Sequence, residues 1–159
     1  MTLSAFLVLS GCSAFAPPQG VAPRGVRTHR HAVQPRMGLV RKVTTAEFEE
    51  EIQDCATPIV LDVFATWCGP CQLMAPELEA VAEKMGDKVR FLKVDADEEP
   101  LVADTLKVQG LPTVMLINDM SVVMRAEGAL MQNELYGLID HHLFGGPAPD
   151  IQNMDSSQQ

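Results

Sequence analysis

The stretch from Ile59 to Cys71 reads Ile-Val-Leu-Asp-Val-Phe-Ala-Thr-Trp-Cys-Gly-Pro-Cys. Its first part, Ile59–Ala65, is apolar except for Asp62, which is typical of a strand buried on both faces. From Pro70 to about Met85, apolar residues recur at helical spacing, and Pro76 is expected to kink this helix. The two cysteines therefore stand where a buried strand meets the first turn of a helix.

A pair of cysteines two residues apart has three common uses: half of a zinc site, part of an iron–sulfur site, or a redox dithiol. Both metal sites need further ligands, but Cys55 stands alone and the four histidines lie outside the strand region. The amide groups and dipole at a helix N-terminus favour a thiolate, which is the reactive form in a dithiol. Gly69 leaves room for a partner, and Pro70 stiffens the turn between the cysteines. The sequence therefore favours redox chemistry at Cys68 and Cys71 and predicts no metal site.

The patterns on either side of this stretch predict an α/β domain. The order of predicted elements is β-α-β-α-β-α-β-β-α, which implies a mixed central sheet with helices on both faces. Besides the elements around the cysteines, the patterns predict strands at Leu39–Val43, Val89–Asp95, Thr113–Asn118 and Val122–Glu127, and helices over 45–53, 100–106 and 132–143. The first of these helices follows a capping box formed by Thr44 and Glu47.

The net charge of −9 conceals two different parts of the chain. Residues 1–46 contain six basic residues and no acid, whereas residues 47–159 contain all 21 acids and six basic residues, a net charge of −15. Such an acidic body would repel phosphates, so we expect no nucleic-acid partner. The basic head is typical of a targeting segment joined to a folded domain.

The first 38 residues are interpreted as a two-part presequence. Residues 3–12 are apolar but too short to span a bilayer, and the small residues after them complete a signal peptide over 1–14. Residues 15–38 have the Arg-rich, acid-free composition of a transit peptide. The junction before Phe15 resembles bipartite presequences of algae whose plastids came from a eukaryotic endosymbiont. A bacterial lipobox ending at Cys12 is the alternative.

The run from Phe64 to Cys71 resembles the active-site run of the thioredoxin family, and the resemblance extends from Leu39 to Leu143. The polar composition of residues 145–159, with two prolines and no apolar pattern, predicts a disordered tail. The resemblance implies a thioredoxin fold over residues 39–144. It also implies that Cys68 is the exposed nucleophile and that Cys71 is the resolving thiol, the two forming a disulfide when oxidised.

The resemblance implies roles for further residues. Asp62 matches a buried acid that helps to move the proton of the resolving cysteine. Pro112 matches a cis-proline that aligns the substrate backbone, and Gly128 matches a glycine at the rim of the substrate groove. The implied substrate-binding surface consists of Trp67, Gly69, Pro70, Leu111, Pro112 and Gly128.

Several positions depart from the common family pattern. Phe91 is taken to occupy the strand position where some bacterial members place a lysine near the buried acid, so we expect a different proton path. Met120 replaces a usual turn glycine, and Gln72 replaces a basic residue. Glu127 places a negative charge at the groove rim. Together, Gln72, the run from Arg125 to Leu130 and the plastid-like presequence look most like the y-type plastid thioredoxins.

The resemblance implies a cofactor-free, monomeric reductase of target-protein disulfides in the plastid stroma, with no membrane attachment once mature. Ferredoxin–thioredoxin reductase would be its donor, and peroxiredoxins and methionine sulfoxide reductases its clients. A secretory disulfide oxidase or isomerase is less favoured, because those relatives usually have a histidine where Pro70 stands. A non-redox binding platform is a third hypothesis, which the presence of both cysteines and Asp62 disfavours.

Other candidates have simpler interpretations. The acidic run Asp95–Glu99 lacks the glycine and spacing of a calcium loop, so we interpret it as a solvated charge run. His141 and His142 stand near a helix C-terminus, where positive charge is favourable. Cys55 is interpreted as a spectator, with a regulatory thiol as the alternative.

Overall fold

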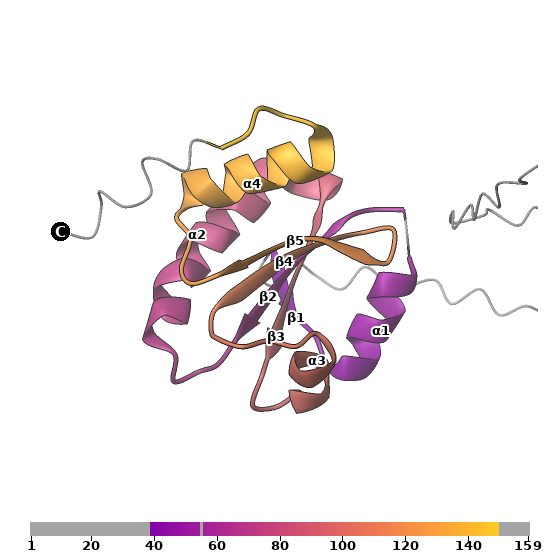
Figure 1. Cartoon of the computed structure of the whole chain (residues 1–159), viewed down its shortest axis with the longest axis vertical. Coiled ribbons are helices and arrows are strands. Elements are labelled where there is room, and N and C mark those ends of the chain that lie inside the picture. Colours follow the sequence, from indigo (N-terminus) through magenta and orange to yellow (C-terminus); the bar gives the residue numbers. More distant parts are fainter. Residues whose placement is uncertain (1–38, 55, 150–159) are drawn as a thin grey trace, which may run out of the picture. The chain divides into compact units, whose positions relative to one another are not determined.

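The computed structural model describes residues 39–54 and 56–149. Its helices and strands are β1 (Val40–Lys42), α1 (Thr45–Gln53), β2 (Ile59–Phe64), α2 (Gly69–Met85), a short 3-10 helix (Gly86–Lys88), β3 (Arg90–Asp95), α3 (Pro100–Thr105), β4 (Thr113–Asn118), β5 (Ser121–Glu127) and α4 (Gln132–Phe144). The strands form one sheet in the order β1-β3-β2-β4-β5 (Figure 1). β1 and β2 run parallel to β3, whereas β4 is antiparallel to both β2 and β5. The predicted mixed sheet is confirmed.

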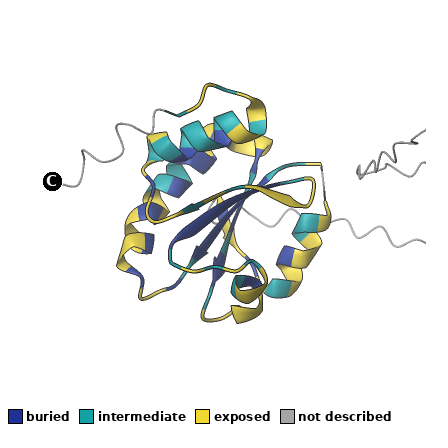
Figure 2. Ribbon diagram, in the orientation of Figure 1, coloured by how far each residue is buried: buried dark blue, intermediate teal, exposed yellow. Residues whose placement is uncertain are grey.

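Each face of the sheet packs against two helices (Figure 1). Met74 of α2 and Ile139 of α4 join Val60 and Val114 in one hydrophobic cluster. Residues from α1 and α3 pack with alternate positions of the same strands in a second cluster, among them Phe48, Leu61, Val63, Val102 and Met115. The central strands β2 and β4 are buried by both clusters, as Figure 2 shows. This explains why the run that precedes the cysteines is apolar at successive positions.

The observed element boundaries follow from local chemistry. The predicted capping box is present, because the Thr44 side chain accepts from the Glu47 amide and the Glu47 side chain accepts from the Thr44 amide. α2 begins at Gly69, one residue before the predicted start, since Cys68 is its N-cap. The same helix continues through Pro76.

The proposed presequence segments, Cys12, Cys55 and residues 150–159 lie outside the described residues. The disordered polar tail over residues 145–159 stays a prediction, and two of its first residues, Gly146 and Pro149, contact α4. The Gly146 amide donates to the Asp140 carbonyl at 3.0 Å, and Pro149 lies so close to Gly137 that a Cβ added there would be 3.2 Å away. Within residues 39–54 and 56–149, no helix has both the length and the apolar composition needed to cross a membrane.

Candidate functional site

Cys68 and Cys71 form a disulfide at the N-terminus of α2. The turn after β2 delivers them there, because the Cys68 amide donates to the Ala65 carbonyl at 3.2 Å. Cys68 is the N-cap, and its Sγ accepts a hydrogen bond from the Cys71 amide at 3.2 Å. Gly69 and Pro70 occupy the first turn of the helix. The arrangement places both sulfur atoms where the positive end of the helix dipole stabilises negative charge.

The two cysteines do not differ in exposure in this oxidised form. Each residue is 4% exposed, and both pack with Ala65, Phe64 and Leu111. The expectation that Cys68 is the exposed member of the pair is therefore wrong for the disulfide state. The cysteines differ instead in their surroundings. Cys71, but not Cys68, lines a pocket that is also lined by Asp62, called here the Asp62 pocket.

This pocket, with a volume of about 120 Å³, brings Asp62 and Cys71 to the same space between β2 and α2. Asp62 is 4% exposed, and its Oδ1 has no hydrogen-bond partner among the described residues. Burial raises the pKa of Asp62 to about 7, while the positive charge of Lys93 opposes that rise. An acid with this pKa exchanges a proton readily near neutral pH.

Lys93, which the sequence interpretation missed, is the lysine beside the buried acid. The parallel pairing of β2 and β3 sets Asp62 opposite Lys93, and both residues line the Asp62 pocket. The expectation that Phe91 replaces this lysine is wrong, because Phe91 pairs with Val60 and is buried in the core. A different proton path on that ground is therefore excluded.

A second loop reaches the cysteines from the start of β4. The peptide bond between Leu111 and Pro112 is cis, as the family resemblance implied. Leu111 packs against the cysteine cluster, and the Gly128 amide donates to the Pro112 carbonyl at 2.9 Å. Gly128 has a φ of +95°, which favours glycine over other residues. The loop is also held by the Thr113 hydroxyl, which donates to the Gly110 carbonyl at 2.7 Å.

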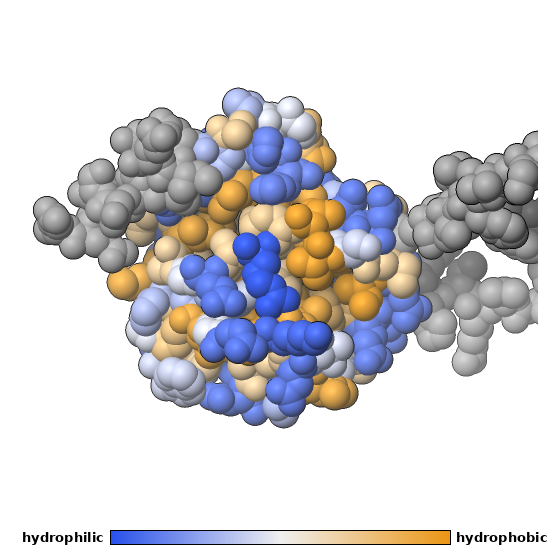
Figure 3. All heavy atoms as spheres, viewed as in Figure 1, coloured by the Kyte–Doolittle hydropathy of each residue, from blue (hydrophilic) through white to orange (hydrophobic). Residues whose placement is uncertain are grey.

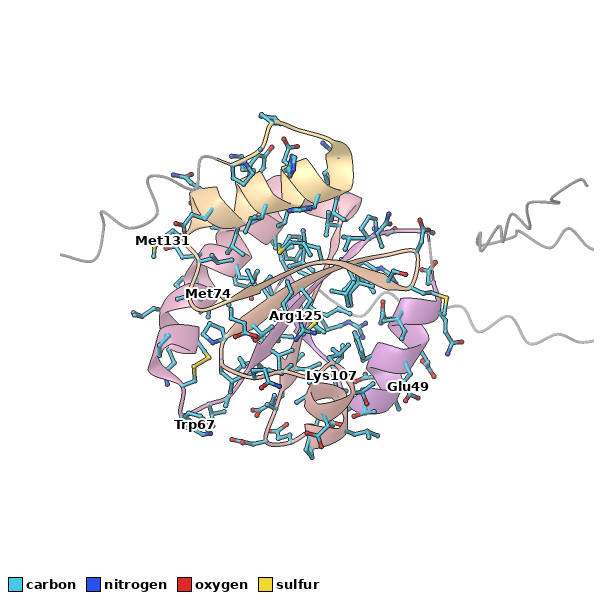
Figure 4. All side chains as sticks on the ribbon, in the orientation of Figure 1. Glu49, Trp67, Met74, Lys107, Arg125 and Met131 are labelled. Atoms are coloured by element: carbon cyan, nitrogen blue, oxygen red, sulfur yellow. A yellow bond between two sulfur atoms is a disulfide. The ribbon has the colours of Figure 1, made fainter. Side chains whose placement is uncertain are left out.

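Trp67 stands beside the disulfide with 70% of its surface exposed (Figure 4). Its indole Nε1–H donates to the Asp97 carboxylate at 2.7 Å, so the ring is fixed although it is exposed. The sequence predicts Asp97 only as part of a solvated acidic run. The signal that could have found it is its position just after β3, whose end meets the same edge of the sheet as the end of the parallel strand β2.

The rest of that acidic run is also structured rather than merely solvated. Asp95 is buried, with the Lys42 ammonium 3.6 Å from its carboxylate. The same ammonium lies 2.6 Å from Glu98. Glu99 accepts hydrogen bonds from the amide and hydroxyl of Thr45 at 3.0 and 2.5 Å. The run thus ties the β3–α3 loop to β1 and α1.

Comparison with known proteins places this geometry in a family. Residues 39–141 match the family model described as Thioredoxin. The chain is 35% identical to Thioredoxin Y, chloroplastic, of rice over 138 residues, which cover 82% of each protein. It is 38% identical over 109 residues to Thioredoxin Y1, chloroplastic, of Arabidopsis thaliana, covering 69% of this chain and 63% of that protein. These matches confirm the similarity to y-type plastid thioredoxins.

The solved structures agree. A crystal structure of chloroplastic thioredoxin z superposes with a TM-score of 0.62 at 38% sequence identity, over 67% of this chain and 96% of that one. The predicted thioredoxin fold is thereby confirmed. With a disulfide at the N-terminus of α2 and a matching sequence over the whole described sheet, the chain belongs to the thioredoxin family and is a thiol–disulfide oxidoreductase that works through Cys68 and Cys71.

Proposed function

We propose that Cys68 attacks the target disulfide and that Cys71 resolves the product. The Cys68 thiolate forms a bond to one target sulfur and releases the other as a thiol after it takes up a proton. The Cys71 thiolate then attacks Cys68 Sγ, which forms the intramolecular disulfide and releases the second target thiol. Two electrons pass from the protein to the target, so the described structure corresponds to the oxidised product. The observation that carries this assignment is the Cys68–Cys71 disulfide next to the Asp62 pocket.

In this scheme Asp62 is the base that accepts the Cys71 proton before the second step. Its place in the same pocket as Cys71, and its pKa of about 7, support this role. Cys68 has no part in that pocket, so Asp62 would act on the resolving step more than on the first attack. Trp67, Leu111, Pro112 and Gly128 would form the surface on which the target chain lies, with Gly69 and Pro70 at its edge.

The direction of the reaction is reduction of the target. The Gly69–Pro70 dipeptide supports this, because oxidases and isomerases of this fold usually carry a histidine next to the second cysteine. A measurement of the reduction potential tests it. A potential near that of thioredoxin supports a reductase, whereas a value near those of the oxidising relatives would favour the secretory alternative.

The roles of the two cysteines are tested by single serine variants. Cys71→Ser should still attack a target disulfide and should accumulate a stable mixed disulfide on Cys68, seen as a band shift that dithiothreitol reverses. Cys68→Ser is the matched control and should form no such adduct. A mixed disulfide on Cys71 of the Cys68→Ser variant, formed at the same rate, would overturn the assignment.

The physiological setting is proposed to be the plastid stroma, with ferredoxin–thioredoxin reductase as electron donor. The chloroplastic names of the relatives support this, and peroxiredoxins and methionine sulfoxide reductases are the proposed clients. Purified reductase with reduced ferredoxin should reduce the Cys68–Cys71 disulfide. Reduction only by an NADPH-dependent thioredoxin reductase would contradict the proposed donor.

The route to the plastid is proposed to depend on the first 38 residues. Removal of residues 1–14 would expose Phe15, and removal of the segment 15–38 would leave a mature chain that begins near Gly38. A fusion of residues 1–38 to a fluorescent protein should enter the plastid of an alga that uses such presequences, and Phe15→Ala should stop it. Retention of the unaltered fusion in the secretory pathway, or lipid attached to Cys12 of the protein from a bacterial source, would overturn this proposal.

A further inference from the structure

Glu127 holds a carboxylate over the loop that leads to the cis-proline. It is the last residue of β5 and pairs with Thr113, the residue after Pro112. Its Oε2 lies 3.9 Å from the position that a Cβ on Gly110 would occupy. Gly110 is followed by Leu111, which packs against the cysteines, and by Pro112, so the carboxylate lies beside the loop that carries the proposed target-binding residues.

No residue in the described part of the chain neutralises this carboxylate. Glu127 is exposed and forms no hydrogen bond or ion pair with any residue in the described ranges 39–54 and 56–149. A cation two residues earlier on the same strand, Arg125, is engaged elsewhere. Its guanidinium donates to the carbonyls of Leu106 and Lys107, the latter at 2.9 Å, at the C-terminal end of α3.

Figure 4 shows Arg125 and Lys107 at neighbouring positions. Figure 3 shows hydrophilic residues gathered on this same face, between apolar areas. The C-terminal carbonyls of a helix carry partial negative charge. These carbonyls, rather than the Glu127 carboxylate, therefore bind the Arg125 guanidinium. The contact also supports Lys107, whose φ of +53° is unusual for a residue with a side chain. Arg125 thus holds the backbone at Leu106 and Lys107, and among the described residues it does not pair with Glu127.

A second carboxylate near the cysteines is that of Asp97, which accepts a hydrogen bond from the exposed indole of Trp67. The basic side chains of the neighbouring strands do not offset these two acids. Lys42 is paired with Glu98 and Asp95, and Lys93 lines the Asp62 pocket. A target that docks across Trp67 and Leu111 therefore meets negative charge at the surface, and complementary charge on the target would speed docking and favour its orientation.

We propose that Glu127 selects target proteins that carry lysine or arginine beside the cysteine under attack. This inference rests on the proposed function and names the class of target. A basic side chain next to the target cysteine would pair with the carboxylate while the target backbone lies along Leu111 and Pro112. An acidic side chain in the same place would be repelled by the unpaired carboxylate.

The test uses three synthetic disulfide peptides that differ only at the two residues beside one cysteine, which are lysine, alanine or glutamate. Pre-reduced protein supplies the electrons in a single turnover, and the rate constants are read from quenched samples. At low salt the unaltered protein should reduce the lysine peptide about fivefold faster than the glutamate peptide. Glu127→Gln should lower that ratio to about twofold, and Glu127→Lys should bring it below one. High salt should bring all ratios towards one.

Glu49→Gln is the matched control, because it removes the same charge from an exposed position on α1, far from Trp67 in Figure 4. It should leave the fivefold ratio unchanged. An equal ratio in the unaltered protein and in Glu127→Lys, with all three peptides reduced, would overturn the role of Glu127 and leave the Cys68–Cys71 chemistry standing. Failure of the unaltered protein to reduce any peptide would overturn both.

Discussion

Lys93 of β3 lies directly opposite Asp62 of β2, and both side chains face the pocket that contains Cys71. Burial favours the protonated form of Asp62, whereas the ammonium of Lys93 favours the ionised form. Burial is the larger effect, so the pKa of Asp62 is about 7 rather than 3.8. At neutral pH both protonation states of Asp62 are therefore populated.

Asp62→Asn should slow release of the target from the mixed disulfide more than it slows the first attack. The variant has no carboxylate to accept the Cys71 proton, so we expect the release rate near pH 7 to fall by roughly tenfold or more. Rapid acid quenching followed by separation of mixed and intramolecular disulfides measures both steps. Equal rates of formation and release in variant and unaltered protein would show that Asp62 has no part in proton transfer.

The same substitution should change how stability depends on pH. Because the pKa of Asp62 is raised to about 7 on folding, the folded protein binds more protons than the unfolded chain between about pH 4 and pH 7. The free energy of unfolding should therefore decrease as pH rises through this window. At about 1.4 kcal/mol per pH unit, the total is about 4 kcal/mol.

Asp62→Asn removes this contribution, so the variant should gain stability relative to the unaltered protein as pH rises from 4 to 8. Urea unfolding of the oxidised proteins at several pH values measures the difference. Parallel pH profiles for the two proteins would mean that the pKa of Asp62 is not raised by folding.

Lys93→Met should shift the pH dependence of mixed-disulfide release upwards. Without the ammonium, the effect of burial is no longer opposed by Lys93, and the pKa of Asp62 should rise above 7. The midpoint of the release rate against pH measures this shift. Lys88→Met, which removes an exposed lysine from the short 3-10 helix, is the matched control and should leave the midpoint in place.

Met120→Gly should stabilise the β4–β5 hairpin. Both turn residues have positive φ, +48° for Asp119 and +60° for Met120, and this conformation costs a residue with a side chain about 1 kcal/mol. The gain should appear as a higher urea midpoint. Met120→Ala is the control, because it removes the exposed side chain but keeps the Cβ. The same gain in both variants would assign the effect to the methionine side chain rather than to the backbone.

The strand and helix around the cysteines could be predicted because local signals agree there. The apolar run ending at Phe64 has the pattern of a doubly buried strand, and the cysteines at its end lie at a helix start. The alternation of apolar residues could not show which residue of β3 stands beside Asp62. Asp62 and Lys93 are far apart in sequence, and their pairing depends on the register of two parallel strands. Phe91 lies two residues away on the same face, so the apolar alternation alone does not distinguish it from Lys93 as the neighbour of Asp62.

The contacts of the acidic run Asp95–Glu99 could not be predicted from the sequence for a similar reason. Its composition is that of a solvated segment, and nothing local distinguishes Asp97, which binds the indole, from its exposed neighbour Glu98. Only the shared edge of β2 and β3 brings Asp97 to Trp67. Contacts between residues on different strands thus depend on how the strands pair, which local sequence patterns do not show.

Trp67 is the only tryptophan of the chain, it directly precedes Cys68 of the disulfide, and its indole is held by the Asp97 carboxylate. A disulfide close to an indole quenches fluorescence by accepting an electron from the excited ring, and a pair of thiols does so much less. We therefore expect the emission of this one residue to rise when the Cys68–Cys71 disulfide is reduced. Electron flow into and out of the chain can be followed in real time without an added dye, with no other indole to contribute background.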